Sequence, residues 1–279
     1  MRAVLLVALL LPAGVNSMTA GDRDAIRAFM KGFDPARWAC VEVSGKPLPG
    51  KQKVFLLSGG YWQRPPAYRY ALALDGDGGV CVLSSLRDSA APPSSNPGEY
   101  QPDATSDGAR TSWSQMSSTA FDGYNQAIAK EDLHIEDESN AIEAARLFVR
   151  WALGPGSFWV LLGSAADIDT HSIDTYRREW YDDKSEMSEA EYLRKVEQEV
   201  ECLKGVIFTP KLARAAGGAW LVRVHIWEYW SGDLAEANLT LDHRGRALRF
   251  RGVRIAEHVG SWGKVPLPTA SRSELIDAR

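Results

Sequence analysis

The segment WLVRVHIWEYW, residues 220–230, carries the side chains of this chain that are best suited to binding. Its β-branched and aromatic residues predict a β-strand, and successive side chains of a strand point to opposite faces. One face is almost entirely apolar. The other combines basic, aromatic and apolar side chains: Leu221, Arg223, His225, Trp227 and Tyr229. Guanidinium groups stack on aromatic rings and bind carboxylates or phosphates through two hydrogen bonds. This face is therefore suited to an anionic or sugar-like ligand, or to an acidic protein partner.

A following β-hairpin is predicted to add two more basic side chains to the same face. The runs NLTL (238–241) and RALRF (246–250) flank DHRG, which is a strong turn sequence. Alternation away from that turn places the apolar side chains of the hairpin on one face of the sheet and Arg249 and Arg251 on the other face. We therefore predict a binding surface of six residues: Arg223, His225, Trp227, Tyr229, Arg249 and Arg251. A second interpretation stays open, in which arginines and aromatic rings only satisfy one another on an exposed or covered sheet face.

Catalysis is the alternative hypothesis for this part of the chain. The sequence lacks the motifs of nucleophile-elbow hydrolases, zinc peptidases, P-loop proteins and dinucleotide-binding domains. A hydrolase would use His225 or His171 with a nearby carboxylate such as Glu228 or Asp169. Missing motifs do not exclude catalysis, because catalytic groups are often distant in sequence. We expect a non-catalytic binding or accessory protein without a cofactor, and keep a secreted or periplasmic hydrolase as the alternative.

Two acidic segments are candidate metal sites. In DIDTH, residues 167–171, alternate carboxylates and the imidazole would share one side of an extended chain. We favour a solvated loop whose Asp side chains cap turns. DGDGG, residues 75–79, is interpreted as a hairpin turn rather than a calcium loop, because strand-like sequence follows it directly. No metal site is therefore predicted.

A mixed fold must position these side chains. Helical periodicity predicts helices at 22–33, 138–153 and 188–204. Strand-like runs occur at 38–43, 53–57, 68–74, 80–85, 158–164, 206–212, 220–230, 238–241 and 246–250. The expected class is α+β, with an antiparallel β-meander packed on helices and a smaller β-rich N-terminal part. In element order alone, a meander behind two helices resembles the cystatin-like and nuclear-transport-factor-like architectures, which host many functions.

The chain is predicted to divide into five parts. They are a signal peptide (1–17), a small β-rich part (18–87), a linker or long loop (88–112), an α+β domain (113–265) and a polar C-terminal tail (266–279). Pro, Ser, Asp and Gly dominate the linker. A β-rich unit so small would be marginal alone, so we expect it either to pack on the second part or to be held by a disulfide.

The N-terminal sequence predicts export to the periplasm or the extracellular space. Arg2 precedes an apolar run, and small residues lead to a cleavage site after Ser17. The run is shorter than the about 20 residues that cross a bilayer. Such compartments are oxidising, so Cys40 and Cys81 are a candidate disulfide between neighbouring strands, which would leave Cys202 unpaired. The sequence does not rank the pairings.

Composition limits the class of partner. The net charge is −4 and no cluster of Lys and Arg appears, which argues against nucleic acid or an anionic membrane. Ten tryptophans outnumber the eight phenylalanines and nine tyrosines, which indicates either stacking platforms or a large aromatic core. Trp38, Trp151 and Trp159 lie in patterned apolar sequence, so we assign them to the core. The expected partner is an exported protein or a small anionic or sugar-like ligand. After cleavage of the signal peptide, we expect the protein to have no integral membrane segment.

Overall fold

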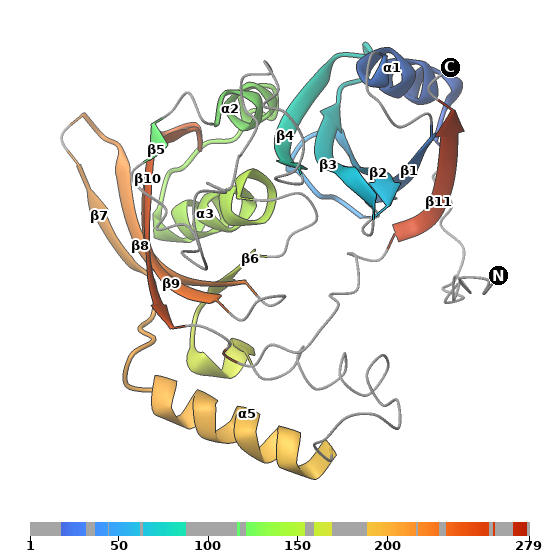
Figure 1. Cartoon of the computed structure of the whole chain (residues 1–279). Helices are drawn as coiled ribbons and strands as arrows, with labels where there is room; N and C mark the ends of the chain where they lie inside the picture. The colour runs from blue at the N-terminus through green and yellow to red at the C-terminus, as the bar shows by residue number, and fades with distance from the viewer. Residues whose placement is uncertain are drawn as a thin grey trace.

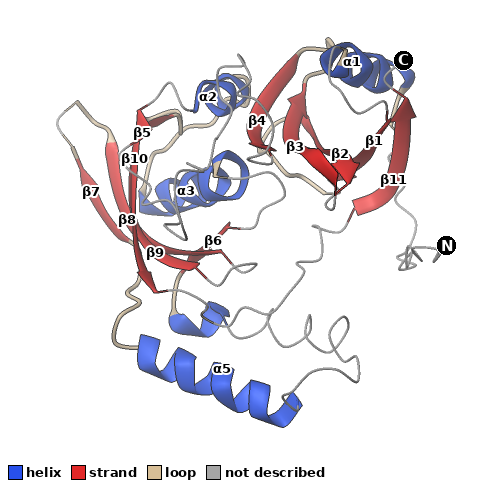
Figure 2. Ribbon diagram, viewed as in Figure 1, coloured by secondary structure: helices blue, strands red, loops and turns tan. Residues whose placement is uncertain are grey.

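The computed structural model shows an α+β fold with two antiparallel sheets, as predicted (Figure 1). It describes residues 18–31, 37–43, 45–61, 64–87, 116–117, 121–153, 159–168, 189–215, 217–228, 233–256, 259 and 270–277. Helices and sheets alternate in layers, so that α1 covers one face of the first sheet and α2 and α3 lie between the two sheets (Figure 2). The helical elements are α1 (Ala20–Met30), α2 (Asp122–Ala129), α3 (Glu138–Ala152), η2 (Ala165–Ile168) and α5 (Glu189–Leu203).

The first sheet has the order β11-β1-β2-β3-β4 within the described residues. Its strands are β1 (Arg37–Val43), β2 (Lys53–Tyr61), β3 (Arg64–Leu74), β4 (Val80–Arg87) and β11 (Ala270–Asp277). The prediction of a C-terminal tail is wrong for 270–277, because this segment pairs antiparallel with β1. The polar sequence of this segment lacks the apolar alternation that predicts a strand, but backbone hydrogen bonding to β1 does not require it.

The candidate disulfide between Cys40 and Cys81 does not form. Cys40 lies on β1 and Cys81 on β4, with β2 and β3 between them. The two side chains also face opposite sides of the sheet, because Cys40 packs with α1 and Cys81 packs in the central core. A disulfide requires Cα atoms within about 7 Å, and three strand intervals of about 4.8 Å exceed that distance.

One central core joins the N-terminal part to the rest of the chain. It contains residues from the first sheet, from α2 and α3 and from the second sheet. Phe148 of α3 lies at its centre, with ring centroids 4.8 Å from Phe121 and 5.5 Å from Tyr124 and Phe250. Trp151 is buried as predicted, and its indole nitrogen donates to the Pro47 carbonyl at 3.0 Å. Packing on the second part is therefore what stabilises the small β-rich part.

Helix α2 is fixed to both sheets by close contacts. At Gly123 a Cβ atom would lie 1.9 Å from the Val82 carbonyl oxygen of β4, so this position needs a residue without a side chain. Two residues later, the Asn125 carboxamide donates to the Ala247 carbonyl at 3.0 Å and accepts from the Ala247 amide at 2.8 Å. These two contacts set the spacing of the layers.

The second sheet has the order β5-β10-β9-β8-β6, and β7 also pairs with β8. Its strands are β5 (Met116–Ser117), β6 (Trp159–Leu162), β7 (Lys211–Arg214), β8 (Trp220–Glu228), β9 (Asp233–Leu241) and β10 (Ala247–Ala256). Strands β7 and β6 share one edge of β8, beside its first and last halves respectively. In the described part of the chain, no helix is long and apolar enough to cross a membrane.

Candidate functional site

The outer face of the second sheet, turned away from α2 and α3, carries the predicted binding residues that the structure describes. Strand register arranges its side chains in three rows. The first row is Arg249, Thr240, Leu221 and Ala213; the second is Arg251, Asn238, Arg223 and Lys211; the third is Val253, Glu236 and His225. The prediction that Arg223, Arg249 and Arg251 share a face is confirmed, whereas Tyr229 lies outside the described residues.

The part of this face around Trp227 is not available for binding. Trp227 is 1% exposed and packs with Ile168 of η2, Val200 of α5 and Ile207. Its indole nitrogen donates to the Val259 carbonyl at 2.9 Å. Trp227 therefore does not contribute to an open binding surface, and the covered-face interpretation applies to this ring, since α5 and the residues beside it cover it.

His225 is buried as well. It is 1% exposed, and the ring of Phe208 packs against it with the centroids 4.3 Å apart. The Phe208 amide donates to Nδ1 of His225 at 3.4 Å, which requires that nitrogen to be unprotonated. Burial lowers the pKa of His225 below its ordinary value, against the opposing effect of the nearby Glu236 carboxylate. His225 is thus a neutral structural residue, and its assignment to an exposed face is corrected.

The segment that covers His225 was predicted as a strand. Residues 206–212 have strand-like composition, yet pairing with β8 begins only at Lys211. Pro210 cannot donate a backbone hydrogen bond, so it does not extend the ladder. The chain before it instead crosses the outer face, where Phe208 lies against the side chains of β8.

Arg223 forms a bidentate salt bridge with Glu236, its diagonal neighbour on β9. Nε lies 2.7 Å from Oε1 and Nη2 lies 2.8 Å from Oε2. This hydrogen-bonded pair lowers the pKa of Glu236 and raises that of Arg223. The guanidinium carbon also lies 4.9 Å from the centre of the Phe208 ring. Arg223 is therefore held in place at the boundary between the covered and open parts of the face.

Three further cations are exposed on the open part: Lys211, Arg249 and Arg251. Among the ion pairs between described residues, none involves these three side chains. The Lys211 ammonium lies 4.6 Å above the Phe208 ring. We call this open area the basic sheet face and define it by Lys211, Leu221, Arg223, Asn238, Thr240, Arg249 and Arg251.

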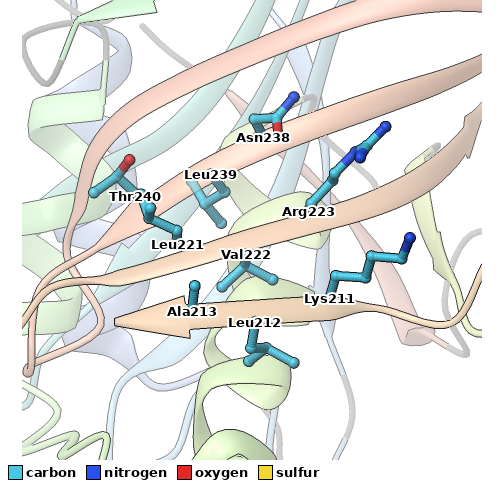
Figure 3. A pocket seen from close by; sticks show the side chains of 9 residues that line it. All are labelled: Lys211, Leu212, Ala213, Leu221, Val222, Arg223, Asn238, Leu239 and Thr240. Atoms are coloured by element: carbon cyan, nitrogen blue, oxygen red, sulfur yellow. The ribbon is translucent and has the colours of Figure 1, made fainter. Parts of the chain in front are cut away.

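A shallow groove occupies the middle of the basic sheet face (Figure 3). Its volume is about 270 Å³, and it is lined by Lys211, Leu212, Ala213, Leu221, Val222, Arg223, Asn238, Leu239 and Thr240. Leu221, the second residue of β8, is 44% exposed. Pockets for whole drug-sized ligands are about 300–1,000 Å³, so this groove suits one or two side chains of a larger partner. Alternation predicted the Arg positions, but only the β7–β8 pairing reveals Lys211 beside them.

The described residues do not form a catalytic site at the predicted positions. His225 pairs in register with Glu236, but its ring is buried and Glu236 is bound by Arg223. Glu228 lies three residues from His225 and therefore on the opposite face of β8. His171 and Asp169 lie outside the described residues. Together these positions give no support to the hydrolase hypothesis.

Asp167, the first carboxylate of the acidic segment 167–171, has a structural role in the described part of the chain. Asp167 accepts hydrogen bonds from the amides of Gly163 and Ser164, at 2.6 Å and 3.0 Å, and so caps η2. This is the structural role that the loop interpretation gave it. Within the described ranges, no three His, Cys, Asp or Glu side chains are grouped in a way that could hold a metal ion.

Comparison of the whole chain with protein-family models, with characterised proteins and with solved structures found no match. The likeness to cystatin-like and nuclear-transport-factor-like architectures therefore remains one of element order. Function has to be inferred from the basic sheet face itself.

Proposed function

We propose that this protein is an exported, non-catalytic binding protein that engages an acidic partner through the basic sheet face. The observation that carries the proposal is the concentration of Lys211, Arg223, Arg249 and Arg251 on one open area of a chain whose net charge is −4. Segregated positive charge attracts an oppositely charged partner and orients it during encounter. Export is supported by the basic and apolar pattern of residues 1–17.

A macromolecular partner fits this surface better than a small ligand does. The groove is shallow, and apolar side chains are exposed in and around it, including Leu221 at 44% and Val253 at 47%. Exposed apolar groups rimmed by charge are typical of protein interaction sites. The side chains project from paired strands, so the backbone of this surface is ordered before binding and association does not have to order it.

The proposal is tested by charge reversal. The chain from residue 18 onward captures partners from an extract of exported proteins, and the affinity of the purified partner is then measured. We expect Arg249→Glu with Arg251→Glu to weaken binding at least about tenfold, which corresponds to about 1.4 kcal/mol. Arg244→Glu is the control, because Arg244 is also an exposed cation but lies in the β9–β10 turn, outside the face. Equal binding by the double variant and the wild type would refute the proposal.

A further inference from the structure

Lys211 lines the groove on β7, whereas Arg249 and Arg251 lie on β10, the strand next to the groove's β9 side, and this arrangement constrains the partner. Arg251 on β10 and Lys211 on β7 belong to the same row, with β9 and β8 between them. Three strand intervals of about 4.8 Å place these two ends of the surface about 14 Å apart. Arg249 adds a second cation at the β10 end.

The surface between these ends is neutral or apolar. Leu221 lies on it, together with the short side chains of Thr240 and Asn238 (Figure 3). The Arg223 guanidinium turns away from Leu221, because its salt bridge reaches Glu236 in the next row. Thr240 and Asn238 each offer a donor and an acceptor within reach of a polypeptide backbone. The surface therefore has positive ends and an apolar middle.

We propose that the partner presents an extended acidic segment that lies across the strands, with two carboxylates four residues apart and an apolar side chain midway. An extended chain advances about 3.4 Å per residue, so four residues span about 14 Å, which matches the separation of the cationic ends. Residues i, i+2 and i+4 point to the same side of such a segment. The two acids then reach the Arg249 and Arg251 end and the Lys211 end, while the middle side chain contacts Leu221.

This inference rests on the proposed function and specifies the partner for the same surface. The exposed Leu221 favours a polypeptide over other polyanions, because a phosphate backbone offers no apolar group at that spacing. The carboxylates explain why Lys211, Arg249 and Arg251 lack ion-pair partners in the described part of the chain.

Two labelled peptides of identical composition test the proposal by fluorescence anisotropy. One contains Glu-Ser-Leu-Ser-Glu in a Gly-Ser background, and the other contains Glu-Glu-Ser-Leu-Ser. We expect the spaced peptide to bind at least about tenfold more tightly, and Lys211→Glu or Arg251→Glu to abolish this preference. Arg244→Glu should keep it. A third peptide with Ser in place of Leu should also lose most of the affinity.

Equal affinity for the two peptides, or binding of neither, would overturn the inference. If partner capture still depended on Arg249 and Arg251 in that case, the binding function would stand and only the spaced-acid segment would fall. If capture of the partner does not depend on Arg249 or Arg251, both proposals are refuted. Another outcome is that the chain associates with itself, in a way that Arg251→Glu disrupts but the spaced peptide does not. That result would identify a second copy as the occupant and would likewise refute an acidic segment.

Discussion

Replacing Gly123 by alanine tests the packing of α2 on the first sheet. The added Cβ would lie 1.9 Å from the Val82 carbonyl oxygen, well inside van der Waals contact. The added Cβ is fixed to the α2 backbone and the oxygen belongs to the β4 backbone, so neither can move by a simple rotamer change. Relief requires α2 to withdraw from β4, which disturbs the buried side chains of Tyr124 and Ala127. Overpacking of a core costs about 1–3 kcal/mol, occasionally more.

The opposing effect of the substitution is smaller. Alanine is favoured over glycine inside a helix by about 1 kcal/mol, partly because it restricts the unfolded chain. Gly21 gives a matched control, because it is also the second residue of its helix and an added Cβ there would meet only the Thr19 hydroxyl, at 3.8 Å. We expect Gly21→Ala to be neutral or stabilising, and Gly123→Ala to lower the free energy of unfolding by about 2 kcal/mol.

Urea unfolding of the chain from residue 18 onward measures the free energy of unfolding of both variants. For a chain of this size, a loss of about 2 kcal/mol corresponds to a decrease of about 4–8 °C in Tm. A Gly123→Ala variant that is as stable as the wild type would show that α2 does not approach β4 so closely. The same result for Gly21→Ala would carry no such meaning, because that position is open.

Three further predictions concern polar contacts of buried or half-buried side chains. Asn125→Ala removes both hydrogen bonds to Ala247 and should cost about 1–3 kcal/mol in urea unfolding, with Asn125→Asp intermediate because it keeps only the acceptor. Burial lowers the pKa of His225 below 6.5, so the unfolded chain binds the proton more readily than the folded chain does. The free energy of unfolding should therefore be highest above about pH 6.5 and decrease as the pH falls below that value. Unfolding measured at several pH values should show a shallower decrease for His225→Gln; an unchanged slope would contradict the burial of this ring. Trp227→Phe loses the hydrogen bond to Val259 and should cost about 1 kcal/mol, whereas Trp227→Ala should cost about 3–5 kcal/mol, and equal losses would argue against the buried packing.

The sequence predicted local order better than it predicted which elements meet. Alternation along 220–228 assigned side chains to the correct faces of β8, since that assignment depends only on strand geometry. It could not show that Trp227 is covered, because the cover comes from η2 and α5, which are distant in sequence. The same limit explains why the candidate pairing of Cys40 with Cys81 is incorrect. Both lie in strands as predicted, but strand order, which periodicity does not encode, separates them.

Phe208 explains why the outer face is half covered and half open. Its ring packs on His225 on one side, while the Arg223 guanidinium and the Lys211 ammonium lie 4.9 Å and 4.6 Å from its centre. The aromatic residue therefore completes the buried cluster and also positions two cations of the basic sheet face. The cation–π contact holds the Lys211 charge without neutralising it, whereas the Arg223 charge is paired with Glu236. Lys211 therefore keeps its positive charge available, which is what the proposed recognition of an acidic partner requires.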